Sequence, residues 1–337
     1  MTASDTQSQP APTQPDVREA DRLCAHLQAV QQETARVIFG QGKVINQTLT
    51  AILAGGHALL VGAPGLGKTL LVTTLGTVLG LDARRVQFTP DLMPSDITGS
   101  EILDEDASGH RSFRFVPGPV FCQLLMADEI NRASPRTQSA LLQAMQERRV
   151  AVAGAEHKLP QPFHVLATQN PLEQEGTYPL PEAQLDRFML QIPLTFPDAE
   201  SERAMLLATT GSEQAPPQQV MSAESLIAAQ ALVRTLPVGE KIVDAILALV
   251  RSARPETTQD ETLRGQIAWG PGSRAAQALM LATRARALLD GRLSPSLDDV
   301  IALARPVLAH RMALTFAARA EGVHLDDVIT RLVNRLG

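Results

Sequence analysis

The sequence has few cysteines and few aromatic residues, and it lacks a long apolar run. Two cysteines, Cys24 and Cys122, stand far apart among 337 residues, which provides neither a metal-binding cluster nor a disulfide framework. Aromatic residues make up 3 % of the chain, so the core is expected to consist mainly of Leu, Ala, Val and Ile. No run of about 18 apolar residues occurs, and no segment is therefore expected to span a membrane.

An excess of basic residues is also missing. The chain has 30 Lys and Arg against 36 Asp and Glu, a formal net charge of -6. This balance argues against a broad nucleic-acid-binding surface, although it is compatible with a local basic patch. Residues 1–15 are rich in Ser, Thr, Gln and Pro and lack an apolar segment, which predicts a disordered tail and no secretory signal. By elimination, we expect a soluble cytoplasmic protein.

Short apolar segments alternate with helical patterns in the first part of the chain. This alternation predicts a parallel α/β sheet with helices on both faces. After Pro197 the strand signals almost disappear, and helical patterns follow in which Pro306 is expected to break or kink one helix. Strands are expected near 57–61, 86–88, 124–127, 164–168 and 188–192, and later helices near 223–234, 240–251, 273–289, 297–316 and 325–336. The predicted organisation is a tail (1–15), an α/β domain (16–197) and a smaller all-helical domain (198–337).

A glycine-rich segment follows the first predicted strand. Residues 62–69 are Gly-Ala-Pro-Gly-Leu-Gly-Lys-Thr and match the Walker A pattern at every fixed position. The glycines permit a loop whose backbone N–H groups face a phosphate chain, and the next helix directs its positive end at the same anion. We expect Lys68 to neutralise phosphate charge and Thr69 to ligate Mg²⁺.

Polar residues also end two later strands. The apolar run 124–127 is followed by Asp128 and Glu129, which places both acids at the carboxyl edge of the sheet, where ligands bind in such folds. We expect Asp128 to hold Mg²⁺ and Glu129 to act as the general base on the attacking water. The run 164–169 ends at Asn170, whose neutral amide is expected to orient water beside the γ-phosphate.

Several segments resemble MoxR-type AAA+ ATPases. The resemblance is dense from about residue 37 to 197, looser in the helical part and absent from the first fifteen residues. It implies a P-loop AAA+ core with a helical lid, ATP and Mg²⁺ as cofactors, and assembly into a ring, commonly a hexamer. The segments are Val61–Thr69, Ala127–Ala133, Thr137–Leu142, Ala167–Pro171 and the highly specific run Glu173–Phe188.

The same resemblance implies roles for individual residues. Asn170 resembles the sensor-1 residue, and Arg187 resembles the arginine finger that reaches the γ-phosphate of a neighbouring subunit. Arg274 resembles the sensor-2 arginine that opens a lid helix. Segments 92–120 and 149–163 resemble two hairpins that the family places toward the ring pore. The residues expected to contact nucleotide are Gly40, Gln41, Gly62, Ala63, Pro64, Gly65, Leu66, Gly67, Lys68, Thr69 and Leu70.

The function that these features favour is an ATPase that remodels or assembles client proteins, with a von Willebrand factor A protein as the usual partner in the family. One alternative is a nucleic-acid motor, which should show a DNA-binding module or a basic stripe. Another is a nucleotide switch, for which a GTPase should show an Asn-Lys-x-Asp guanine motif. The sequence contains none of these features, and the Asp128–Glu129 pair favours turnover over a switch.

Overall fold

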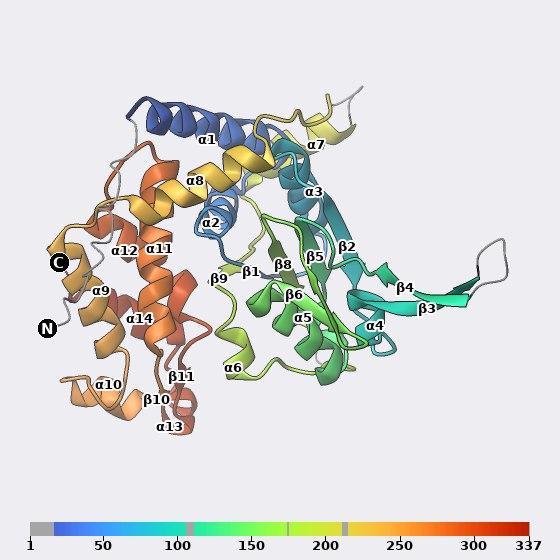
Figure 1. The fold of residues 1–337 in the computed structure, drawn as a ribbon. Coiled ribbons are helices and arrows are strands. Elements are labelled where there is room, and N and C mark those ends of the chain that lie inside the picture. The colour runs from blue at the N-terminus through green and yellow to red at the C-terminus, as the bar shows by residue number, and fades with distance from the viewer. Residues whose placement is uncertain (1–16, 106–110, 174, 211–214, 337) are drawn as a thin grey trace, which may run out of the picture.

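The structure is a computed structural model that describes residues 17–105, 111–173, 175–210 and 215–336. An α/β part and a mainly helical part lie side by side (Figure 1). The tail predicted at 1–15 lies outside the described residues, as does the segment 106–110 of the first hairpin.

Five parallel strands form the central sheet, in the order β2-β5-β8-β1-β9. All five segments predicted as strands belong to it, which confirms the parallel α/β fold. Strand β2 begins earlier than predicted because it is an edge strand, and its largely exposed Arg84 and Arg85 interrupt the apolar pattern. The strands are β1 (Ala58–Val61), β2 (Ala83–Gln87), β5 (Leu124–Asp128), β8 (His164–Gln169) and β9 (Leu190–Pro193).

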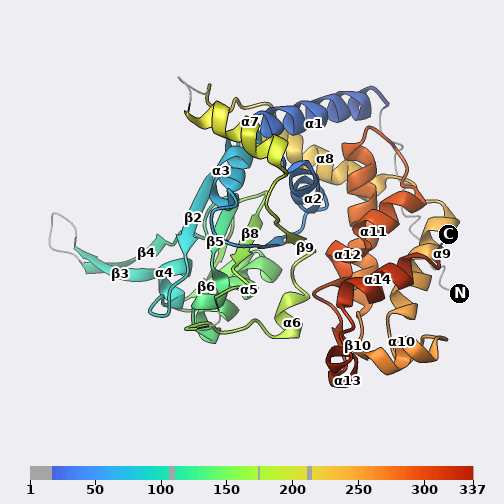
Figure 2. The same ribbon diagram turned by 180° about the vertical axis from the view of Figure 1, so that it is seen from behind.

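Helices cover both faces of this sheet (Figure 1 and Figure 2). Alternate strand residues enter different hydrophobic clusters, because side chains along a strand point to opposite faces. Leu60 and Met126 pack with α1, α2 and α3 on one face, whereas Leu59 and Leu125 pack with α4 and α5 on the other. The helices are α1 (Val17–Val37), α2 (Gly42–Leu53), α3 (Lys68–Val78), α4 (Pro94–Thr98) and α5 (Pro135–Glu147).

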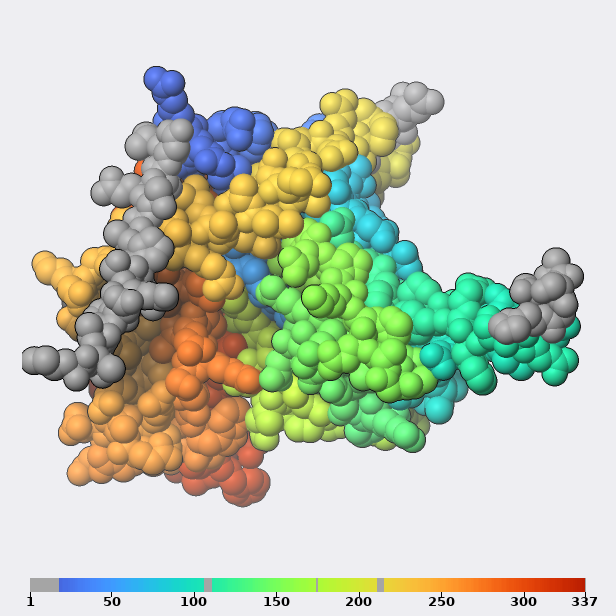
Figure 3. All heavy atoms as spheres, in the orientation of Figure 1, coloured from blue at the N-terminus to red at the C-terminus, as the bar shows by residue number. Residues whose placement is uncertain are grey.

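Two antiparallel hairpins extend from the α/β part. The first pairs β3 (Gly99–Glu105) with β4 (Arg111–Pro117), and Figure 3 shows that it projects from the body of the molecule. The second pairs β6 (Arg149–Val152) with β7 (Ala155–Lys158). A short 3₁₀ helix, η1 (Ile130–Arg132), follows β5, and α6 (Glu182–Leu185) precedes β9.

The C-terminal part is mainly helical, as predicted, with one addition. Two short strands pair antiparallel beside the helices. The helical stretch predicted over 297–316, with a break or kink at Pro306, is wrong in its end: α12 includes Pro306 and ends at Leu308, because the chain then turns back to form β11. The elements are α7 (Ala199–Thr210), α8 (Ala223–Thr235), α9 (Glu240–Ser252), α10 (Glu261–Gln266), β10 (Ile267–Trp269), α11 (Ser273–Leu289), α12 (Leu297–Leu308), β11 (Ala313–Leu314), α13 (Phe316–Ala320) and α14 (Leu325–Val333).

The hydrophobic cluster that contains α1, α2 and α3 continues into the helical part. It includes buried residues of α8, α9, α11, α12 and α14 as well as one face of the sheet. Helix α11 packs against both α2 and α8, and α1 also contacts α8 and α11. The sheet face and the helical part therefore share one apolar interior.

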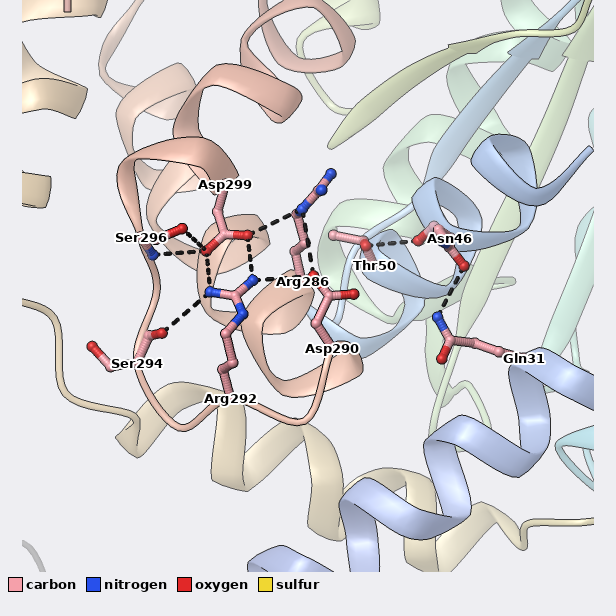
Figure 4. Close-up of polar contacts among 9 residues, drawn as sticks. All are labelled: Gln31, Asn46, Thr50, Arg286, Asp290, Arg292, Ser294, Ser296 and Asp299. Atoms are coloured by element: carbon pink, nitrogen blue, oxygen red, sulfur yellow. Dashed lines mark hydrogen bonds and ion pairs between the residues drawn. The ribbon is translucent and has the colours of Figure 1, made fainter. Parts of the chain in front are cut away.

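A buried carboxylate fixes the connection between α11 and α12 (Figure 4). Asp299 is 1 % exposed. Its oxygens accept hydrogen bonds from Arg286 Nε at 3.0 Å, from Arg292 Nη2 at 2.7 Å and from the Ser296 backbone N–H at 2.7 Å. The last bond belongs to a capping box at the start of α12. One side chain thus caps α12 and binds two arginines at the end of α11 and in the loop that follows it.

Asp299→Ala is expected to lower the free energy of unfolding by about 2–4 kcal/mol, because it removes the helix cap and the buried acceptor that two arginines share, which then keep only Asp290 as an acidic partner. Thermal or urea denaturation measures the change. Asp326→Ala is the matched control, since the Arg305–Asp326 ion pair lies on the surface and such pairs contribute about 0–1 kcal/mol. Equal losses of stability in the two variants would contradict the proposed role of Asp299.

Three described histidines are buried in neutral form. The Val165 N–H donates to His57 Nδ1 at 2.9 Å, so Nε2 carries the proton and donates to the Met145 carbonyl at 3.2 Å. His164 Nδ1 donates to the Gly56 carbonyl at 2.8 Å. Burial lowers the pKa of His57 to about 3 and the pKa of His164 to about 4. Burial likewise lowers the pKa of His310, the third, to about 3.

Acidification from about pH 7 to pH 5 is expected to destabilise the protein by about 2 kcal/mol for each of these histidines. Below about pH 6.5 an unfolded histidine binds a proton that the folded state excludes, so stability falls with pH until the folded pKa is reached. Urea midpoints across this range measure the effect. His164→Gln is expected to reduce it by about a third, while His324→Gln, at an exposed position, should leave it unchanged. Midpoints that do not vary with pH would reject this account.

The two cysteines form neither a disulfide nor a metal cluster in the described part of the chain. Cys122 is buried, and burial raises its pKa to about 12, so its thiol is held protonated; Cys24 is half-buried, and the two are free thiols. Across the described ranges, no helix has both the length and the apolar character needed to cross a membrane. The cytoplasmic location stays a prediction.

Candidate nucleotide site

The glycine-rich loop connects β1 to α3 at the carboxyl edge of the sheet. Gly65 and Gly67 adopt left-handed backbone conformations with φ of +83° and +72°, which other residues rarely adopt. Lys68 begins α3, and its Nζ donates to the Gly62 carbonyl at 2.8 Å. The unpaired N–H groups of the first helical turn therefore open onto the loop beside a cation, as an anion site requires.

A pocket of about 420 Å³ lies in front of this loop. Burial lowers the pKa of Lys68, and the carboxylates of Asp128 and Glu129 oppose that shift. The pocket thus combines a cation with two carboxylates that face it. Residues from the loop and from the ends of β5 and β8 line it: Pro64, Gly65, Gly67, Lys68, Thr69, Leu70, Asp128, Glu129 and Asn170.

Asp128 ends β5 and is held by two neighbouring strands. Its Oδ1 accepts a hydrogen bond of 2.5 Å from the Thr168 hydroxyl, and its Oδ2 accepts one of 2.6 Å from Arg85 Nη2. The Thr69 and Asp128 side chains line the same pocket. A hydroxyl and a carboxylate are oxygen donors of the kind that Mg²⁺ prefers when it also binds phosphate. The donor set therefore fits the ion.

Glu129 has an unusual backbone conformation directly after the strand. Its φ of 54° lies in the left-handed region, which costs about 1 kcal/mol for such a residue. Its N–H donates to the Thr168 hydroxyl at 2.8 Å. Its Oε2 accepts from Gln87 Nε2 at 2.7 Å and from Arg132 Nη1 at 3.0 Å. The conformation and these bonds hold the carboxylate at the pocket.

Asn170 follows β8 and is buried at the pocket wall. Its Oδ1 accepts a hydrogen bond of 3.1 Å from the Leu172 N–H. This bond orients the amide at the end of the strand that lies between β5 and β1. Asn170 thus stands beside the acids of β5 and the loop after β1.

Comparison with known proteins matches both parts of the chain. Residues 57–190 match the model of the ATPase family associated with various cellular activities (AAA), and residues 260–332 match that of the AAA lid domain. The chain is 39 % identical to the protein named Chaperone MoxR1 of Mycobacterium tuberculosis, over 93 % of this chain and 83 % of that protein. This chain belongs to the MoxR family of AAA ATPases.

Two further comparisons support this placement. Protein MoxR of Methylorubrum extorquens is 31 % identical, over 84 % of this chain and 86 % of that protein. A crystal structure of a candidate ATPase from Cytophaga hutchinsonii superposes with a TM-score of 0.87 at 38 % identity, covering 94 % of this chain and 96 % of that one. The MoxR resemblance and the fold predicted from the sequence are confirmed.

The segment before α2 in this MoxR-family chain contacts the phosphate loop. The Gln41 amide donates to the Leu66 carbonyl at 3.1 Å. Gly40 has a φ of +68°, and a Cβ at this position would lie 2.5 Å from the Ser201 Cβ. Among the loop residues predicted to contact nucleotide, Gly62, Ala63 and Leu66 do not line the pocket. The Gln41 side chain therefore holds the loop at Leu66.

The two arginines predicted as catalytic do not line the pocket in front of the glycine-rich loop, which is the candidate phosphate pocket. Arg187 lies between α6 and β9, and Arg274 lies in the first turn of α11. Together with Asp186 and Arg311 they line a second pocket of about 300 Å³. Arg274 Nη1 lies 3.5 Å from Asp186 Oδ2. Within the described ranges, the half-buried Arg187 side chain has no hydrogen bond or ion pair, so its charge is available to another group.

Several contacts at these sites were not predicted from the sequence. Arg85 and Gln87 of β2 hold Asp128 and Glu129, and Thr168 links the two acids. Gln87 and Thr168 could have been found from the sequence, because each is a polar residue near the end of a predicted strand, and both strands lie beside the strand ending in Asp128. Arg311 had no such signal, because the segment 186–189 that it holds lies more than a hundred positions away in the sequence.

Proposed function

We propose that this chain is a Mg²⁺-dependent ATPase that works as a homo-oligomeric ring, commonly a hexamer in its family, and remodels or assembles client proteins. The observation that carries this proposal is the separation of polar groups into two pockets. The groups proposed to bind and attack ATP line the phosphate pocket, while Arg187, the cation proposed to stabilise the reaction, lines the other. A head-to-tail contact between subunits would bring the two together.

Each polar side chain of the phosphate pocket has a role in this proposal. Lys68 and the loop N–H groups would bind the β- and γ-phosphates, and Thr69 and Asp128 would hold Mg²⁺, which would neutralise phosphate charge. Glu129 accepts a proton from water as the water oxygen attacks the γ-phosphorus and the bond to the ADP oxygen breaks. Asn170 orients that water. Arg187 of the adjacent subunit stabilises the charge that develops on the γ-phosphoryl oxygens.

The β3–β4 hairpin is the proposed contact for a protein client. Leu103 and Phe113 are opposite each other across the two strands, and they are 56 % and 73 % exposed. An exposed apolar pair on a projecting hairpin is typical of a protein-binding surface. Arg111 and Arg114 of the same hairpin form ion pairs with Glu105 and Asp104, which favours a protein over a nucleic acid. A von Willebrand factor A partner is proposed from the family resemblance.

A trap experiment tests the proposal. With ATP, a Glu129→Gln ring is expected to retain client proteins from an extract of its own cells, because hydrolysis no longer releases them. Adding Leu103→Ser and Phe113→Ser to the trap should reduce retention by about tenfold, since burial of these side chains stabilises the contact. Mass spectrometry measures the retained proteins. Trapping on Arg111→Ser, a control on the same hairpin, should be unchanged; equal retention by all three traps would contradict the hairpin's role.

A further inference from the structure

A buried arginine of the helical part holds the segment that carries Arg187. Arg311 lies between α12 and β11, and its side chain is 3 % exposed. Nε donates to Asp186 Oδ1 at 2.7 Å, and Nη2 donates to the Asp186 carbonyl at 3.2 Å and to the Phe188 carbonyl at 2.7 Å. Nη1 donates to the Met189 carbonyl at 3.1 Å. Arg311 therefore binds residues on both sides of Arg187.

The guanidinium of Arg311 is fully used in this contact. Nη1 also donates to the Val307 carbonyl of α12 at 2.7 Å. The five hydrogen bonds match the five N–H groups of an arginine, whose planar geometry fixes their directions. A lysine has three donors on a flexible chain and cannot reproduce this set. Arg311 thus makes four hydrogen bonds to segment 186–189 and one to α12.

The helical part reaches the same segment through two more residues. Arg274 of α11 lies 3.5 Å from Asp186 Oδ2, so the Asp186 carboxylate is shared between two arginines. His310 Nε2 donates to the Phe188 carbonyl at 2.9 Å. Phe188 is fully buried in the hydrophobic cluster on the face of the sheet that α4 and α5 cover. Two residues later the chain enters β9, which pairs with β1. Residue 187 is therefore held between the sheet and the helical part.

We propose that Arg311, acting through Asp186, is a positioning residue that places Arg187 for the active site of the neighbouring subunit. This inference rests on the proposed role of Arg187 as the arginine that acts in the adjacent subunit. A displacement of about 1 Å at such a group can cost about 10²-fold in rate. Contacts of Arg311 lie in the second pocket and not in the phosphate pocket, so nucleotide binding by the same subunit does not depend on them.

Arg311→Lys is expected to lower the kcat for ATP hydrolysis by about 10- to 100-fold and to leave KM within about twofold of the wild-type value. The change in kcat without KM separates a positioning role from damage to the phosphate pocket. Arg305→Lys is the matched control, because Arg305 is a surface arginine of α12 that pairs with Asp326. Its kcat and melting temperature should match those of the wild type.

Mixed rings provide the decisive measurement. Lys68→Ala removes the phosphate site of a subunit but leaves its segment 186–189 intact. Equal amounts of Arg311→Lys and Lys68→Ala subunits are allowed to mix at random. Half of all sites then have an intact phosphate pocket, and half of these receive a correctly placed Arg187 from a Lys68→Ala neighbour. The mixture should therefore recover about a quarter of wild-type turnover. Arg311→Lys mixed with Arg187→Ala should recover none, because neither supplies a placed arginine.

The outcomes distinguish this inference from the proposed function. Arg187→Ala mixed with Lys68→Ala is the reference, and if it recovers no turnover, the action of Arg187 on the neighbour is overturned. If it recovers but Arg311→Lys with Lys68→Ala does not, Arg311 is structural and the positioning role is overturned. Should Arg311→Lys not fold, Asp186→Asn decides in its place: it keeps an oxygen for Arg311, loses the shared charge, and should show the same loss of kcat and the same recovery.

Discussion

Arg187→Ala is expected to reduce ATP turnover by about 10³- to 10⁵-fold, the range that arginine fingers contribute in other phosphoryl-transfer enzymes. The physical reason is the loss of a cation that stabilises charge on the γ-phosphoryl oxygens of the adjacent subunit. Within the described residues, the Arg187 side chain has no hydrogen bond or ion pair, so the substitution breaks no such contact there. Stability should therefore change little.

Turnover per subunit, measured against protein concentration, tests how this residue acts. Wild-type turnover should rise as subunits associate, and the Arg187→Ala variant should show no rise at any concentration. Arg305→Ala is the control, since it removes a surface arginine that is paired with Asp326 and should retain the concentration dependence. If the protein sediments as a monomer and is fully active in that state, the proposal is wrong.

Glu129→Gln should lower turnover by about 10²- to 10⁴-fold while ATP binding persists, because the amide keeps the shape of the side chain but cannot accept the proton. Lys68→Ala should fail earlier, at nucleotide binding, since the charge that faces the phosphates is removed. The shift of the melting temperature by ATP separates the two, as a ligand stabilises only a chain that binds it. Glu156→Gln, on the second hairpin, is the control.

Two results would contradict the roles of Glu129 and Lys68. If Glu129→Gln hydrolyses ATP at the wild-type rate, the general base is another group. If ATP raises the melting temperature of Lys68→Ala as much as that of the wild type, the cation contributes little to binding. Either outcome would require a different assignment of the pocket.

The phosphate loop and the strand ends were predictable because each is a local pattern. Residues 62–69 have the Walker A spacing, and Asp128, Glu129 and Asn170 each follow an apolar strand. Parallel strands bring their carboxyl ends to one edge, so sequence order alone places these residues together. The pocket that they line was therefore predictable from the sequence.

Other features depend on contacts between distant segments. Arg311 and Asp186 are 125 positions apart, and no local pattern links them. The end of α12 at Leu308 depends on the pairing of β11 with β10, which a helical pattern over 297–316 does not reveal. The location of Arg187 and Arg274 in a second pocket likewise follows from how the helical part packs on the sheet.

The apolar interior shared by the sheet and the helical part has a consequence for how this protein can be dissected. The predicted division at residue 197 separates the α/β part from the helical part, but it is not a place where the chain can be cut. A fragment ending there would expose the faces of α1 and α2 that α8 and α11 cover, and such a surface promotes aggregation. The lid of a relative could replace this one only if the faces of α1 and α2 were exchanged with it.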